Sequence, residues 1–221
     1  MSFSSKAIKY FCNLKSSQTL INKIKIINPY ISPEVKSVVK EFFNNFYSDN
    51  NDRIFIIGIN PGRFGGGLTG ISFTDPVALR EHCGIKNNLG NKKELSSKFI
   101  YQFANEFGGT KKFFSKVFLT ALYPFALIQN GKNYNYYDNK SLALKLKKDI
   151  IKNISAQISF GARRDFAIIL GKKNADHFIP INKEMEFFDK LIILEHPRYI
   201  MQYKLKSVDS YIKKYIEVIN K

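Results

Sequence analysis

The residues best suited to chemistry lie in one segment, Gly58 to Phe73, which reads GINPGRFGGGLTGISF. This segment, called the glycine loop below, holds six glycines and directly follows the apolar run Ile54–Ile57. Because glycine has no Cβ and tolerates positive φ angles, such a loop lets backbone amides approach a ligand closely. The loop carries one amide side chain, Asn60, immediately before Pro61. These features favour a ligand-binding loop over an ordinary glycine-rich connection.

A histidine occupies a comparable position much later in the chain. His196 directly follows the apolar run Lys190–Glu195. The other two histidines, His82 and His177, have no such setting, and we interpret both as surface residues. An amide and an imidazole thus follow two separate candidate strands.

Four short apolar runs predict the strands that position these residues. The runs do not alternate between apolar and polar residues, so both faces of the sheet are expected to be covered, as in a parallel sheet. They are Arg53–Gly58, Val117–Leu122, Phe166–Gly171 and Lys190–Glu195.

Helical patterns separate most of the strands. Ser32, Pro33 and Glu34 form an N-cap signal before an apolar stripe that runs from Val35 to Phe46. Further stripes begin near Leu95, Leu142 and Val208, and Asp75 before Pro76 is interpreted as another N-cap. The expected order is helix–helix–strand–helix–helix–strand–helix–strand–strand–helix, with an exposed polar loop at 130–139. This order predicts an α/β protein: a three-layer α/β/α fold with a central four-stranded, mostly parallel sheet.

In such sheets ligands bind beyond the carboxyl ends of the strands. Asn60 follows the first strand and His196 the fourth, while the second ends at Ala121 and the third before Lys172 and Lys173. If all four strands are parallel, these tips meet at one crevice, and Asn60 and His196 share a site.

At these residues the chain resembles a known family. GINPGRFGGGLTGISF is similar to the first motif of the single-strand-selective monofunctional uracil-DNA glycosylases, within the uracil-DNA glycosylase superfamily. His196-Pro197-Arg198 resembles the start of the superfamily's second motif, which begins His-Pro. The resemblance is specific over about twenty residues and architectural elsewhere. It implies an enzyme that flips a nucleotide out of the DNA stack and cuts its N-glycosidic bond with water.

The resemblance implies a role for three side chains. Asn60 matches the residue that holds the attacking water, although an amide cannot act as a strong base. His196 matches the histidine that donates a hydrogen bond to a carbonyl oxygen of the departing base. Phe73 matches the ring that stacks on the flipped base; a core phenylalanine is the alternative in a chain with 20 of them.

The same resemblance extends to other positions at the strand ends. The base-binding residues it implies are Gly58, Ile59, Pro61, Gly62, Phe73 and Ala121. The DNA-binding residues are Arg63, Gly70, Lys172, Lys173, Arg198 and Tyr199. A solvated side chain is the alternative for Arg198 and for the lysine pair.

One position departs from the family pattern. Where the family has a strand-end asparagine that reads the uracil edge, this chain has Ala121, with Thr120 beside it and Tyr123 close by. Alanine offers no polar side-chain atom, so uracil itself is in question and another deaminated base remains open. The family's usual Ser-Pro continuation after Pro197 is also absent, so insertion into the duplex is expected to differ.

Composition limits the partners. The net charge is +17, from 35 basic and 18 acidic residues, and it favours nucleic acid as the partner, with a lysine-rich compositional bias as the alternative. No apolar segment is long enough to span a membrane, and the N-terminus does not resemble a secretory signal. Cys12 and Cys83 cannot supply a zinc ribbon or an iron–sulfur cluster, so we expect no metal and no cofactor.

These observations favour a monofunctional DNA glycosylase of base-excision repair, because neither motif contains a lysine nucleophile. A nucleic-acid-binding relative with little catalysis and a hydrolase of free nucleosides remain as alternatives. We expect one intracellular, cytoplasmic, monomeric domain over residues 1–221, with residues 1–50 as a helical elaboration. DNA, single- or double-stranded, is the expected partner, without a membrane.

Overall fold

A four-stranded sheet forms the centre of the computed structural model, which describes residues 1–16 and 23–221. The strand order is β3-β2-β6-β7, and every neighbouring pair is parallel. The strands are β2 (Ile54–Gly58), β3 (Val117–Ala121), β6 (Phe166–Leu170) and β7 (Lys190–Leu194). All four predicted strands are therefore present, and the three-layer α/β/α class with a central parallel sheet is confirmed.

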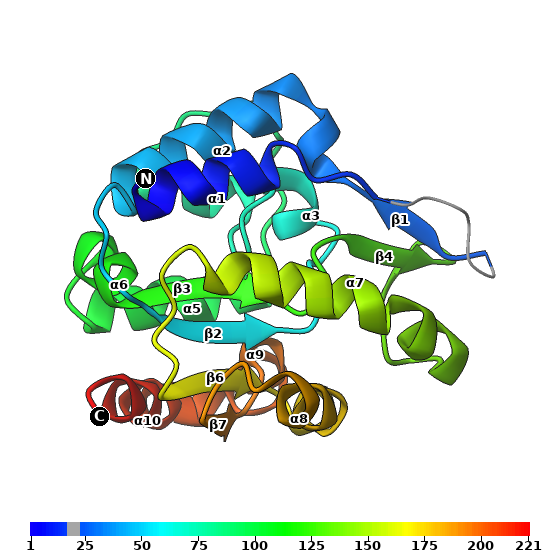
Figure 1. Cartoon of the computed structure of the whole chain (residues 1–221). Coiled ribbons are helices and arrows are strands. Elements are labelled where there is room, and N and C mark those ends of the chain that lie inside the picture. The colour runs from blue at the N-terminus through cyan, green and yellow to red at the C-terminus, as the bar shows by residue number, and fades with distance from the viewer. Residues whose placement is uncertain (17–22) are drawn as a thin grey trace.

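Helices cover both faces of this sheet. In Figure 1, α7 (Lys140–Ile158) lies in front of the sheet, and α5 (Leu95–Glu106) lies behind it. The latter packs against α4, α6, α9 and α10. The remaining helices and turns are α1 (Phe3–Phe11), η1 (Pro29–Ile31), α2 (Pro33–Phe46), α3 (Gly66–Thr69), α4 (Pro76–Cys83), α6 (Thr110–Lys116), α8 (Lys172–Met185), α9 (Pro197–Tyr203), η2 (Leu205–Ser207) and α10 (Val208–Ile219).

The N-terminal helices belong to the same hydrophobic core as the sheet. Ser32 caps α2 by accepting a hydrogen bond from the Val35 backbone N–H, as its N-cap pattern predicts. The helix buries its apolar stripe, and α1 packs along it with Phe3 and Phe11 buried. In Figure 1 the two helices lie side by side along one edge of the molecule.

One predicted connection is wrong. The third and fourth strands were expected to follow each other directly, but α8 lies between them. Because β6 and β7 are parallel neighbours, with Phe166 opposite Lys190, the chain must cross over between them, and α8 supplies that crossover. Pro180 lies inside α8. Because proline disfavours the interior of a helix, its presence obscures the helical pattern of this segment in the sequence.

A second, smaller sheet corrects another prediction. It is antiparallel, in the order β1-β4-β5, and comprises β1 (Lys25–Ile27), β4 (Ala126–Gln129) and β5 (Lys132–Tyr134). The segment 130–139 is therefore not an exposed loop: part of it is paired, and Tyr136 is only 2% exposed. Residues 132–138 are called the hairpin segment below. The turn before it has positive φ at both Asn130 and Gly131, at 49° and 70°, as in a tight hairpin turn.

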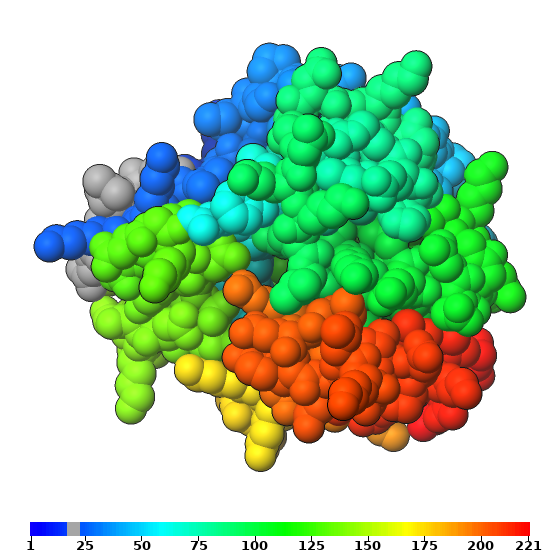
Figure 2. All heavy atoms as spheres, turned by 180° about the vertical axis from the view of Figure 1, so that it is seen from behind, coloured from blue at the N-terminus to red at the C-terminus, as the bar shows by residue number. Residues whose placement is uncertain are grey.

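Segments that are far apart in sequence meet on one face. Seen from behind in Figure 2, orange atoms of the region around α9 lie beside green atoms of the region around α5 and yellow-green atoms between residues 130 and 150.

In the described part of the chain, no helix combines the length and apolar character needed to cross a membrane.

Candidate active site

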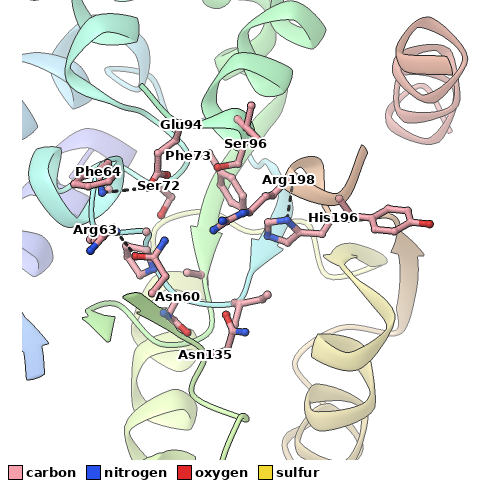
Figure 3. A pocket seen from close by; sticks show the side chains of 18 of the residues that line it. Asn60, Arg63, Phe64, Ser72, Phe73, Glu94, Ser96, Asn135, His196 and Arg198 are labelled. Carbon is pink, nitrogen blue, oxygen red and sulfur yellow. Dashed lines mark hydrogen bonds between the residues drawn. The ribbon is translucent and has the colours of Figure 1, made fainter. Parts of the chain in front are cut away.

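A pocket of about 720 Å³ lies at the carboxyl end of the parallel sheet. Four stretches of chain supply most of its walls: the glycine loop, residues 93–96 at the start of α5, the hairpin segment, and residues 196–203 of α9. Asn60 and His196 both line it, as the parallel strand ends predict. Figure 3 shows the two side chains on different sides of the same cavity.

The Asn60 side chain is held at both of its polar atoms. Its Nδ2 donates to the Tyr134 carbonyl, and its Oδ1 accepts from the Tyr136 backbone N–H, each at 3.1 Å. A carbonyl and an N–H on either side fix which end of the amide is oxygen. Because an amide oxygen accepts two hydrogen bonds, Oδ1 retains one acceptor position on the pocket wall.

His196 forms the N-cap of α9. Its Nδ1 accepts a hydrogen bond from the Arg198 backbone N–H at 3.2 Å. In the neutral ring the proton must therefore be on Nε2, which has no acceptor among the described residues. Burial, with a smaller contribution from the nearby Arg198 charge, lowers the pKa of His196 from 6.5 to about 4. The imidazole is thus a neutral hydrogen-bond donor at physiological pH.

Phe73 completes one side of this pocket. Its ring lies 6.0 Å from the His196 ring, centroid to centroid, and its backbone has a positive φ of 58°. The ring occupies the place that a side chain at residue 58 would need: a Cβ built on Gly58 would lie 2.4 Å from Phe73 Cζ. Gly58 itself does not line the pocket, so the structure gives it the task of seating the aromatic ring.

Glu94 is a pocket residue that the sequence patterns did not indicate. Its Oε1 accepts a hydrogen bond from the Phe64 backbone N–H at 3.1 Å. A Cβ on Gly62 would lie 2.2 Å from Glu94 Oε1, and one on Gly65 would lie 2.4 Å from Oε2. Burial raises the pKa of the Glu94 carboxyl, although the Phe64 hydrogen bond opposes this shift. The glycines therefore admit a carboxylate that fixes the loop.

The backbone position of Glu94 is set by a second acid. Asp75 Oδ2 accepts from the Glu94 N–H at 2.9 Å, while its Oδ1 caps α4 at Val77 and Ala78. The interpretation of Asp75 as an N-cap is confirmed.

The other predicted site residues divide into two groups. Those that line the pocket are Ile59, Pro61, Gly62, Arg63, Phe73, Ala121, Arg198 and Tyr199. Those that do not line it are Gly58, Gly70, Lys172 and Lys173. Gly70 is buried against Tyr30, Val35 and Val39. Both lysines are exposed at the start of α8, so their predicted DNA contact does not involve this cavity.

Ala121 leaves its part of the wall without a polar side chain, and its neighbours do not replace one. The Thr120 hydroxyl donates to Gln157 of α7 at 2.5 Å, within the core. Tyr123 is 3% exposed and does not line the pocket. The polar side chains that line the cavity from unpredicted positions are Ser72, Lys93, Glu94, Ser96, Lys132, Asn133, Asn135, Gln202 and Tyr203.

The described residues contain no group of three or more His, Cys, Asp or Glu side chains arranged to hold a metal ion. The polar groups of the pocket include the Asn60 amide and the neutral His196 imidazole. They can orient a small nucleophile on one side and stabilise developing negative charge on another.

Comparisons with known proteins agree with this geometry. The family model of the uracil DNA glycosylase superfamily matches residues 45–220. The crystal structure of wild-type Pedobacter heparinus SMUG2 is similar to this chain, with a TM-score of 0.94 and 38% sequence identity. The similarity covers 100% of this chain and 97% of that chain. No curated protein matches the sequence.

Proposed function

This chain belongs to the uracil-DNA glycosylase superfamily, and from that membership we propose that it is a monofunctional DNA glycosylase that hydrolyses the N-glycosidic bond of a flipped-out deaminated base. The resemblance of its two motifs to this superfamily is confirmed. Uracil is the first candidate base, because the family whose model matches this chain is named for it.

One observation carries the proposal. Asn60 and His196 come from the ends of β2 and β7, which are not neighbouring strands, yet both line the same cavity beside Phe73. A base seated against the Phe73 ring would have a hydrogen-bond donor on one side and a water-orienting amide on another. Stacking on one aromatic ring contributes about 1–3 kcal/mol per base.

Asn60 positions the nucleophile in this proposal. Its amide is locked by the Tyr134 carbonyl and the Tyr136 N–H, so its remaining acceptor position can hold a water toward the sugar carbon C1′. The amide is not a strong base, and its contribution is one of orientation. The water oxygen bonds to C1′ as the bond from C1′ to the base nitrogen breaks. The water then gives up one proton to solvent and the base anion takes one up, so the products are an abasic sugar and the free base.

His196 stabilises the leaving group. The base departs with the electron pair of the glycosidic bond and becomes an anion. The neutral ring donates from Nε2–H to the carbonyl oxygen where this charge develops, because its Nδ1 is occupied by the Arg198 N–H. Loss of one such donor typically costs about 2.7–4 kcal/mol in the transition state.

The charge of the chain supports a polyanionic substrate. Arg63, Lys93, Lys132 and Arg198 all line the cavity, and the whole chain carries +17. A field of this sign raises the encounter rate with DNA, and we expect affinity to fall steeply with salt as counterions are released. A salt-independent affinity would contradict this part of the proposal.

The test uses oligonucleotides, single- and double-stranded, that carry uracil, hypoxanthine or xanthine. Incubation followed by alkali reveals abasic sites, and a parallel sample without alkali reports any lyase step. We expect alkali-dependent cleavage by the wild type and no covalent adduct on borohydride reduction, since no lysine acts as nucleophile. Asn60→Ala should lose at least about a hundredfold in turnover while its DNA affinity changes little.

Each other outcome points to a different function. Tight binding with intact oligonucleotide would favour a binding protein, and activity on free nucleosides alone would favour a nucleoside hydrolase. A borohydride adduct would instead assign a nucleophile to a pocket lysine such as Lys93 or Lys132. An Asn60→Ala variant with full activity would remove the water-holding role.

A further inference from the structure

The pocket described above has no base-reading amide at the position where the family pattern places one. Ala121 is apolar, the Thr120 hydroxyl is bonded inside the core, and Tyr123 does not reach the cavity. A base in this pocket would still present a Watson–Crick edge. Buried polar edges without partners are costly, so a group from another element is required.

The backbone on either side of Asn135 is hydrogen-bonded to the Asn60 side chain. The two backbone groups that hold the Asn60 amide are the Tyr134 carbonyl and the Tyr136 N–H, the immediate neighbours of Asn135 in sequence. The position of Asn135 relative to the Asn60 amide is therefore fixed by two hydrogen bonds. Asn135 is half-buried and lines the pocket, and Figure 3 shows its side chain beside that of Asn60.

Further hydrogen bonds hold the hairpin segment against the core. The Tyr136 hydroxyl is bonded to Asn174 Oδ1 at 3.2 Å, and both side chains are buried. Asn174 in turn donates to the carbonyl of Ile57, one residue before Gly58. The hairpin segment is thus tied to the end of β2, from which the glycine loop departs.

Asp138 orients the Asn135 amide. Its Oδ2 accepts from the Asn135 backbone N–H at 2.9 Å, and its Oδ1 accepts from Asn135 Nδ2 at 3.3 Å. A carboxylate cannot donate, so it selects the amide rotamer that turns Nδ2 toward it. The Asn135 Oδ1 and one N–H of Nδ2 have no partner among the described residues and remain available.

We propose that Asn135 is the residue that reads the Watson–Crick edge of the flipped base, in place of the missing amide at Ala121. It accepts from the ring N–H and donates to the adjacent carbonyl. A ring N–H beside a carbonyl is shared by uracil, hypoxanthine and xanthine, the deamination products of cytosine, adenine and guanine. The inference rests on the proposed glycosylase function and adds its specificity-determining residue.

The same arrangement disfavours cytosine and adenine, the parent bases of uracil and hypoxanthine. Cytosine and adenine present a ring nitrogen that accepts and an amino group that donates, the reverse of an imide edge. An amide could pair with them only after a half-turn, and that turn would point its Oδ1 at the Asp138 carboxylate. Two oxygens without a proton between them repel, so the pair Asn135–Asp138 discriminates uracil from cytosine and hypoxanthine from adenine. Thymine and guanine carry the same ring N–H beside a carbonyl, so this contact does not act against them.

The experiment compares two bases in the same oligonucleotide: uracil and 2-pyrimidinone, which keeps the 2-carbonyl but lacks the 4-carbonyl and the N3–H. Asn135→Ala should slow uracil excision by roughly tenfold to a hundredfold. Excision of 2-pyrimidinone should stay within about twofold of wild type, because that base has no imide edge to lose. Asn44→Ala, an exposed position on α2, serves as the matched control and should change neither rate.

A role in which Asn135 merely supports Asn60 makes a different prediction. Both substrates would then slow by the same factor, and an unchanged ratio would overturn the inference. If Asn135→Ala does not fold, Asn135→Ser, which is too short to span the edge, carries the same expectation. Failure of the wild type to release uracil would refute the proposed function itself, whereas wild-type activity with an unaltered ratio would refute only the role of Asn135.

Discussion

The glycine loop and the hairpin segment both line the pocket, but they are fixed by different means. The glycine loop is shaped by what it lacks: Gly62 and Gly65 leave room for the Glu94 carboxylate, and Gly58 leaves room for the Phe73 ring. The hairpin segment is shaped by what it carries: buried Tyr136 bonds it to Asn174, and Asp138 accepts a hydrogen bond from Asn135 within the segment.

This difference predicts how strongly each wall of the pocket responds to a single substitution. A wall made by missing side chains tolerates no added atom, since backbone and carboxylate already fill the space. A wall made by hydrogen bonds loses them one at a time, and each loss is partial. We therefore expect a single substitution in the glycine loop to lower the excision rate strongly, and a single substitution in the hairpin segment to lower it only modestly.

The largest effect is expected from Gly62→Ala. The added Cβ would lie 2.2 Å from Glu94 Oε1, so the carboxylate or the loop must move. A displacement of about 1 Å in a site of this kind costs about a hundredfold in rate. Single-turnover excision rates check this. The double variant Gly62→Ala/Glu94→Ala should recover part of the loss if the clash is the cause, and no recovery would place the sensitivity elsewhere.

A smaller effect is expected from Tyr136→Phe in the hairpin segment. The variant removes the hydroxyl bonded to Asn174 and loosens the backbone N–H that holds Asn60. One lost hydrogen bond corresponds to about 1 kcal/mol, or about fivefold in turnover. Tyr137→Phe is the matched control, because its hydroxyl makes no hydrogen bond within the described part of the chain. A loss as large as that of Gly62→Ala would erase the contrast between the two walls.

The last prediction concerns stability rather than turnover, and it involves His196, which belongs to neither wall. The pKa of His196 is about 4 in the folded chain, against 6.5 for the ordinary side chain in the unfolded chain. Between these pH values the unfolded chain binds a proton that the folded chain does not. The free energy of unfolding attributable to His196 is therefore present above pH 6.5 and is lost as the pH falls toward 4. Denaturation curves of wild type and His196→Asn between these limits should converge at low pH. A constant difference would show that His196 does not titrate as described.

Much of the framework was readable from the sequence. Apolar runs without alternation give the four parallel strands, and the Ser32 and Asp75 signals give two capped helices, because both depend on neighbours within a few residues. Parallel strands also force Asn60 and His196 to one edge, so their meeting needs no knowledge of the helices between them.

The hairpin segment shows why the remainder was missed. Asn130-Gly131 is a recognised hairpin signal, yet the polar run after it obscured β5. The burial of Tyr136 depends on Asn174, which is 38 residues away, and nothing local encodes that contact. Glu94 was not predicted for the same reason, because its contact with Phe64 of the glycine loop joins residues 30 positions apart in sequence.

The sequence by itself indicated four strands, a mostly parallel sheet and two side chains at its carboxyl edge, because non-alternating apolar runs and the residues that follow them are visible within short windows. Only the tertiary structure decided which nitrogen of His196 carries its proton, which way the Asn60 amide points, and which asparagine stands beside it. The Asn60 amide is oriented by hydrogen bonds to Tyr134 and Tyr136, distant in sequence, which exist only after the chain has packed. The His196 tautomer depends on a local hydrogen bond from the Arg198 N–H, whose geometry is set when α9 forms.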